Sequence, residues 1–317
     1  MCLILCACWV VYIHELHKFV IIANNFKAVS CPLTITRLFL IKSIHTCINH
    51  LMMNTALYFF IDGHHKLVRW RLVTHCGIDG YSRLVVYLKC SNNNTASTVY
   101  NLFLEAVDLY GLPSRVRSDQ GTENYRVAQH MLEHRGIERR SMLVGTSVHN
   151  QRIERFWRDL HRCVTGTYYR LFYFLEQQGV LDPLNEYHLY ALHFIYLPRI
   201  NRSLEEFKAG WNHHSIRTEH NATPLQLFSA GALRLRNSGA VAVDFFDHVE
   251  NNYGVEEDGV VGNDGGVDIP ENRIQLSGEQ HSELQSRIDP LSDSDDFGVE
   301  LYERTLDFLR TIVTSRS

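Results

Sequence analysis

Between residues 58 and 144, the spacing of apolar residues along the chain changes from one segment to the next. Residues 58–61 form a short apolar run, residues 70–78 alternate apolar with polar positions, and residues 84–88 are almost continuously apolar. The first two patterns are typical of strands, and the third of a strand covered on both faces. Asp79 and Gly80 form a hairpin turn signal between the second and third runs. Three consecutive strands are therefore predicted.

Beyond the third run, apolar positions return to helical spacing and then alternate between helix and strand. The predicted elements are a helix over 99–110, a strand over 115–118, a helix over 129–134 and a strand over 139–144. The polar residues 91–94 supply helix N-cap candidates, and Gly111 and Gly136 are expected to end the two helices.

A further helix is predicted after a Gly/Ser/Thr loop, with Asn150 as its N-cap. Its expected buried stripe is Ile153, Phe156, Trp157, Leu160 and Val164. Asn150, Glu154 and Arg158 then share a neighbouring face at i, i+4 and i+8.

The element order is β-β-β-α-β-α-β-α. A strand–helix–strand connection crosses right-handed and makes its two strands parallel, whereas the opening hairpins are antiparallel. We therefore predict an α/β fold with a mixed five-stranded sheet and helices on both faces.

Charge and composition divide the chain into three segments. Residues 1–57 carry four basic residues and one acidic, residues 58–230 carry 20 basic and 16 acidic, and residues 231–317 carry seven basic and 18 acidic. The apolar runs of 1–57 are too short to cross a membrane, so no membrane partner is expected and the segment has no clear interpretation. Residues 58–230 form the predicted core with a helical extension. Residues 231–317 are expected to be an acidic, largely disordered tail with a terminal helix and an unidentified protein partner.

Eight cysteines are present without a CxxC pair. A disulfide framework is not expected in a chain of this size. Cys76, Cys90 and Cys163 lie in apolar or mixed runs and are expected to be buried thiols.

Three acidic residues stand where the predicted elements could bring them together: Asp62, Asp119 and Glu154, the last two 35 positions apart. If the 58–61 and 115–118 strands pair in parallel, Asp62 and Asp119 share the edge where open α/β sheets place their sites. Asp79 then lies at the opposite end and is interpreted as a turn residue. Glu154, in the first turn of its helix, is expected to point back at that edge.

Clustered carboxylates repel one another unless cations neutralise them, and all-oxygen ligands suit Mg²⁺ or Mn²⁺. Two such ions serve in-line phosphoryl transfer, so the predicted substrate is a phosphodiester. Alone, Glu154 would be read as a carboxylate that complements the helix dipole and pairs with Arg158.

The segments FFIDGHHKL, SDQGTEN and HNQRIERFWRD resemble the catalytic core of retroviral-type integrases and DDE transposases. Asp62, Asp119 and Glu154 match the metal-binding acids of that family. The runs IDGHHKLVRWRLVTHCGIDGYSRLVVYL and WNHHSIRTEHNATPLQLF further resemble integrase-core proteins of animal genomes, descended from mobile elements. The resemblance covers residues 58–230 and implies a ribonuclease H-like fold.

The resemblance implies DNA integration: binding of double-stranded DNA, and Mg²⁺-dependent cleavage by water or joining by a 3′-hydroxyl. It also implies a homo-oligomer and a nuclear location. The expected DNA-binding residues are Arg152, Arg155, Arg158, Arg162, His149 and Asn150. The alternative for the arginines is a solvated charged face.

Two other functions remain open. The chain could be a non-catalytic DNA-binding or protein-interaction module that keeps only the fold, or a nuclease that acts on RNA–DNA hybrids. Metal binding would distinguish an integrase from the non-catalytic module. Substrate preference would distinguish it from the nuclease.

Overall fold

The structure is a computed structural model that describes residues 58–136, 139–145, 151–238 and 267–314. The elements below belong to one compact unit, Ile48–Ser317. The predicted N-terminal segment, residues 1–57, lies outside the described residues.

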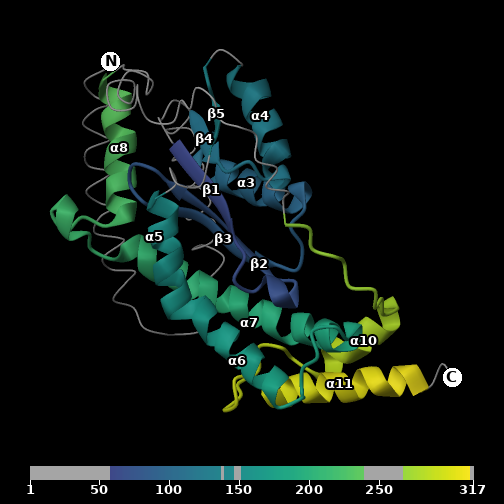
Figure 1. The fold of residues 1–317 in the computed structure, drawn as a ribbon. Coiled ribbons are helices and arrows are strands. Elements are labelled where there is room, and N and C mark those ends of the chain that lie inside the picture. The colour runs from purple at the N-terminus through teal and green to yellow at the C-terminus, as the bar shows by residue number, and fades with distance from the viewer. Residues whose placement is uncertain (1–57, 137–138, 146–150, 239–266, 315–317) are drawn as a thin grey trace, which may run out of the picture. The chain divides into compact units, whose positions relative to one another are not determined.

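Five strands form one mixed sheet in the order β3-β2-β1-β4-β5 (Figure 1). They are β1 (Tyr58–His64), β2 (Val73–Asp79), β3 (Val85–Ser91), β4 (Arg115–Ser118) and β5 (Met142–Val144). The first three pair antiparallel, whereas β4 lies parallel to β1 on one side and to β5 on the other. The predicted mixed five-stranded sheet is confirmed.

Helices connect and extend these strands. They are α3 (Ala96–Tyr110), α4 (Tyr125–Arg135), α5 (Gln151–Leu160), α6 (Gly166–Gln177), α7 (Glu186–His213), α8 (Pro224–Ser238), α10 (Gly278–Arg287) and α11 (Val299–Thr314). Short 3-10 turns are η1 (Val68–Trp70), η2 (Thr122–Asn124) and η5 (Arg217–Glu219), and η4 (His161–Thr165) is a π-helical turn.

Alternate residues of β1 point into two separate cores, because successive strand side chains face opposite sides of a sheet. Phe59 and Ile61 pack with apolar residues of α3, α4 and α8. Tyr58 and Phe60 belong to the larger core, which α5, α6 and α7 build on the other face. Helices therefore cover both faces, as predicted.

The predicted boundaries differ from the observed ones in a few places. The N-cap of α3 is Thr95, whose side chain accepts a hydrogen bond from the Thr98 N–H at 3.3 Å. Asn93, from the predicted 91–94 stretch, supports this cap by accepting from the Thr95 hydroxyl at 3.2 Å. The predicted 139–144 strand is limited to its last three residues in β5.

The π-helical turn η4 joins α5 to α6. Gly166 directly after it has no room for a side chain, since an added Cβ would lie 2.5 Å from the His161 carbonyl oxygen. A π turn places one extra residue in the helix and recurs at functional sites. The glycine thus permits the wider turn that begins with His161.

The segment predicted to be a largely disordered acidic tail contains α10 as well as the predicted terminal helix, α11, which packs against α7. Leu301, Tyr302, Leu306 and Leu309 bury one face of α11 in the larger core, while the acidic residues occupy its exposed face. The helix that the sequence argument did not predict is α10. The expected terminal helix is confirmed, and residues 239–266 lie outside the described residues.

Two thiols behave as predicted and one does not. Cys76 and Cys90 are buried in the larger core, whereas Cys163 is exposed on η4. No helix in the described part of the chain combines the length and the apolar character needed to cross a membrane.

Candidate functional site

Asp62 and Asp119 lie at the same edge of the sheet. Parallel pairing sets Tyr58 opposite Arg115 and Phe60 opposite Arg117, so β1 reaches Asp62 where β4 ends and the chain continues to Asp119. This is the predicted arrangement of the two strands. Carboxyl ends of adjacent parallel strands are where open α/β sheets place their sites.

Asp79 lies at the opposite end of β1, because it pairs with Phe59. Its buried carboxylate accepts hydrogen bonds from the Ser82 hydroxyl at 2.6 Å and the Ser82 N–H at 2.8 Å. Burial raises its pKa, against the effect of these hydrogen bonds. These contacts hold the β2–β3 turn together, and the prediction of a turn residue is confirmed.

Two donors fix the Asp62 carboxylate. The Gly63 N–H donates to Oδ1 at 2.8 Å, and the Trp157 indole N–H donates to Oδ2 at 2.7 Å. Burial is the largest cause that raises the pKa of Asp62 to about 7, and the charge of Asp119 raises it further. The ionised form of Asp62 therefore destabilises the folded protein at neutral pH until a cation neutralises its charge.

Asp119 is oriented by the 3-10 turn η2 that follows it. The Asn124 side-chain amide donates to Asp119 Oδ1 at 3.0 Å, and the Gly121 N–H points to the same oxygen at 3.4 Å. Oδ2 takes no hydrogen bond from the described residues. One oxygen is thus held in place and the other remains available to a ligand.

Glu154 is exposed on the first turn of α5, while its neighbours Ile153 and Phe156 are fully buried. Trp157, one helical turn later, is the α5 residue that contacts Asp62. Among the described residues, no three His, Cys, Asp or Glu side chains are arranged to hold a metal ion. The structure therefore brings Asp62 and Asp119 together and leaves Glu154 outside the pair, so its role stays a prediction.

The expected DNA-binding residues fall partly within the described residues. Arg155 and Arg158 on α5 and Arg162 on η4 are exposed. His149 and Asn150 lie outside the described residues, and so does the side chain of Arg152.

A histidine cluster that sequence reasoning missed borders Asp62. His64 is buried and stacks on Trp157 with ring centroids 4.9 Å apart, and His161 lies 6.2 Å from His64. Burial, and then the positive charges of His161 and Lys66, lower the pKa of His64 to about 4. A neutral His64 therefore supports the indole ring that donates to Asp62.

Other missed residues had recognisable signals. A buried Trp needs an acceptor for its indole N–H. For Trp157 on α5 this acceptor is Asp62, the acid in β1. Glu123 and Asn124, in the DQGTEN segment, are also buried beside Asp119. Polar residues just after a strand-end acid are candidates to orient it.

The aspartate pair fits one divalent cation. Both side chains offer carboxylate oxygens, which Mg²⁺ and Mn²⁺ prefer, and Asp119 is close enough for its charge to act on Asp62. The raised pKa of Asp62 shows that the described donors do not neutralise this charge. The two ions predicted from the sequence would need a further ligand besides Asp62 and Asp119.

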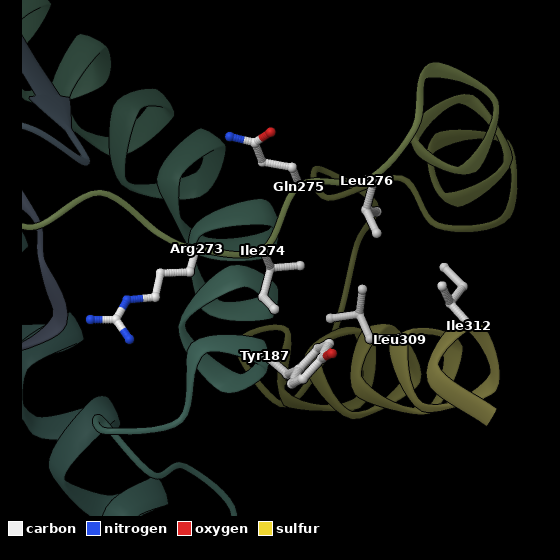
Figure 2. A pocket seen from close by; sticks show the side chains of 7 residues that line it. All are labelled: Tyr187, Arg273, Ile274, Gln275, Leu276, Leu309 and Ile312. Carbon is white, nitrogen blue, oxygen red and sulfur yellow. The ribbon is translucent and has the colours of Figure 1, made fainter. Parts of the chain in front are cut away.

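The structure also has a cavity of about 370 Å³ away from these acids (Figure 2). It is lined by Tyr187, Arg273, Ile274, Gln275, Leu276, Leu309 and Ile312. Figure 2 shows Arg273 extending away from the apolar side chains. The lining contains no predicted site residue.

Three of the solved structures to which this chain is similar come from viral integrases and an intasome. The catalytic core domain of HTLV-2 integrase in complex with magnesium, in its trimeric form, is 15% identical, with a TM-score of 0.38, and covers 55% of this chain and 97% of that chain. Its dimeric form is 14% identical, with a TM-score of 0.37, over 56% of this chain and 99% of that chain. The simian T-cell lymphotropic virus intasome in complex with PP2A regulatory subunit B56 gamma is 16% identical, with a TM-score of 0.38, over 56% and 55%.

No curated protein matches the sequence. The family model "Integrase core domain" matches residues 50–242, more than half of the chain. This range contains the whole mixed sheet and both aspartates at its edge. The chain therefore belongs to the integrase core domain family and has its ribonuclease H-like fold.

Proposed function

We propose that the chain binds double-stranded DNA and catalyses divalent-metal-dependent cleavage or joining of phosphodiester bonds. The observation that carries this proposal is the placement of Asp62 and Asp119 at the ends of adjacent parallel strands, where the charge of Asp119 acts on Asp62. When bound, the cation would supply charge neutralisation and activate the attacking oxygen. Water is the nucleophile in cleavage and a 3′-hydroxyl in joining.

Asp62 and Asp119 would hold the cation in this reaction. The Trp157 N–H and the Gly63 N–H keep Asp62 oriented, and Asn124 keeps Asp119 oriented, so both acids are positioned before substrate binds. In this proposal Glu154, exposed on α5 one helical turn before Trp157, would supply the further ligand for a second ion.

The exposed face that continues from Glu154 would bind the DNA backbone. Arg155, Arg158 and Arg162 follow Glu154 along α5 and into η4. Lys66 and Arg170 add positive charge near His161 on η4: burial is the largest cause that lowers the pKa of His161, and these two charges lower it further. Such contacts give affinity that is independent of DNA sequence and falls with salt. A homo-oligomer, a nuclear location and descent from a mobile element belong to the same proposal.

The purified full chain tests the activity. It would be incubated with end-labelled duplex DNA and Mg²⁺ or Mn²⁺, beside the Asp119→Asn variant and a sample with EDTA. We expect nicked or joined products from the wild type alone. Products from Asp119→Asn would disprove the role of this residue, and no products from the wild type would disprove catalysis.

One observation favours a second candidate, a non-catalytic module that keeps the fold and binds DNA. Glu154 does not join Asp62 and Asp119, and no described group of three metal-ligating side chains exists. This candidate predicts that DNA binding survives Asp119→Asn and that Mg²⁺ raises neither affinity nor melting temperature. Metal-dependent stabilisation of the wild type that is lost in Asp119→Asn would exclude it.

A further inference from the structure

Glu123 is a buried carboxylate next to the proposed cation site. It belongs to the 3-10 turn η2, four residues after Asp119, and only 7% of its surface is exposed. Glutamate is almost never this buried unless its charge is paired. The burial of the Glu123 carboxylate therefore costs stability, and the packing of the sheet and helices described above does not require it.

One oxygen of this carboxylate lacks a partner. The Glu123 backbone N–H and the Asn94 side chain act on the carboxylate as hydrogen-bond donors. Oε2 is nevertheless buried and has no hydrogen-bond partner among the described residues. Leaving such an acceptor unsatisfied costs about 1–3 kcal/mol, so an unpaired oxygen beside a functional site indicates a ligand or water.

Gly121 links Glu123 to Asp119. Its N–H points to Asp119 Oδ1 at 3.4 Å, and a Cβ added to it would lie 2.3 Å from Glu123 Oε1. The Glu123 carboxylate thus packs directly on the glycine that orients Asp119. Burial is the largest cause that raises the pKa of Glu123 and the pKa of Asp62. The charge of Asp119 raises the pKa of Glu123 further, and the charge of Glu123 adds to the rise at Asp62.

We propose that Glu123 is a positioning residue of the cation site, and that its Oε2 accepts a hydrogen bond from water in the hydration shell of a cation held by Asp62 and Asp119. Contact through water agrees with the lack of three described side chains placed to ligate one ion. The negative charge of Glu123 would strengthen the attraction of the site for the cation. This inference rests on the proposed function.

Mn²⁺ binding to the full chain tests the role of Glu123. Isothermal titration would compare the wild type with Glu123→Gln, Asp119→Asn and a matched control, Glu105→Gln, which removes an exposed charge on α3. Loss of a group that supports metal ligands weakens metal affinity about 10–100-fold. We expect a weakening of about tenfold or more in Glu123→Gln and no change in the Glu105 control.

Unfolding in EDTA separates this role from a purely structural one. Because Glu123→Gln removes an unpaired buried charge, its metal-free melting temperature should equal or exceed that of the wild type. A lower melting temperature with unchanged Mn²⁺ affinity would assign Glu123 to the fold and overturn the proposal. If Glu123→Gln does not fold, Glu123→Met, of similar length and uncharged, replaces it, and failure of both would also overturn the proposal.

The outcomes also distinguish this inference from the proposed function. Loss of binding in Asp119→Asn with wild-type binding in Glu123→Gln would refute the inference alone. Absence of Mn²⁺ binding in the wild type, or unchanged binding in Asp119→Asn, would refute the cation site itself.

Discussion

Replacing Asp62 with Asn should change how the metal-free stability of the protein depends on pH. Burial raises the pKa of Asp62 from 3.8 to about 7. Between these two values the folded state keeps a proton that the unfolded state has released. Stability that depends on Asp62 is therefore complete below about pH 4 and is lost as pH rises toward 7.

The size of the effect follows from the pKa shift. Each pKa unit corresponds to about 1.4 kcal/mol, so the rise costs the folded state about 4 kcal/mol once Asp62 is ionised in both states. About 2–3 kcal/mol of this falls between pH 5 and pH 8. Asp62→Asn keeps the size of the side chain and removes the titration.

Urea unfolding in EDTA, followed by tryptophan fluorescence, measures the difference. Other titrating groups, such as buried Asp79, are present in both proteins and cancel in the comparison. We expect the wild type to lose about 2–3 kcal/mol relative to Asp62→Asn from pH 5 to pH 8. Added Mg²⁺ at pH 8 should restore stability to the wild type alone.

A difference between the two proteins that stays constant from pH 5 to pH 8 would refute the reasoning. It would mean that Asp62 is already neutralised in the folded protein without a metal. Equal stabilisation of both proteins by Mg²⁺ would place the cation elsewhere.

Three further variants test other parts of the structure. Trp157→Phe keeps the ring but leaves Asp62 Oδ2 without its donor at 2.7 Å. It should cost about 1–3 kcal/mol in urea unfolding, more at pH 8 than at pH 5 because the ionised acceptor binds the donor more strongly, and equal losses at both pH values would contradict this. Arg71→Ala removes a two-bond ion pair with Glu186, 2.7 Å at its shortest, and should lower stability by about 1–3 kcal/mol. Because Arg71 and Glu186 also bond the backbone of Glu271 and Arg273, proteolysis within residues 267–276 should be faster. An unchanged digestion pattern would show that this ion pair does not hold the segment in place. Leu309→Ala should cost about 2–5 kcal/mol in the same unfolding assay because the side chain is 1% exposed in the larger core, and a negligible loss would show that α11 is not part of the stable fold.

The order and direction of the strands could be predicted because short-range patterns and handedness determine them. Alternation, turn signals and the right-handed crossover predicted the strands and their directions, whereas the pairing of β1 with β4, which sets Asp62 and Asp119 at one edge and Asp79 at the other, was assumed and is given by the structure. These rules depend on backbone geometry, which the sequence pattern reports directly.

Contacts between distant side chains were less accessible. The hydrogen bond from Trp157 to Asp62 spans 95 positions, and the burial of Glu123 depends on how η2 packs, so neither follows from local periodicity. The role of Glu154 stays a prediction, because helix position alone does not determine where an exposed side chain points. The acidic composition of residues 231–317 led to the prediction of a largely disordered segment and concealed α10, whose Leu284 is buried in the larger core.

The π turn between α5 and α6 takes up one residue more than a regular helix would hold. Because the extra residue is taken up within η4, α6 keeps the phase in which Phe172 and Leu175 are buried in the larger core. Removing the exposed Cys163 and closing η4 into a regular helix would leave this phase nearly unchanged. Removing one residue from α6 before Phe172 would instead rotate the rest of the helix by about 100° and turn both side chains away from the core. A one-residue deletion in η4 should therefore do less harm than one in α6.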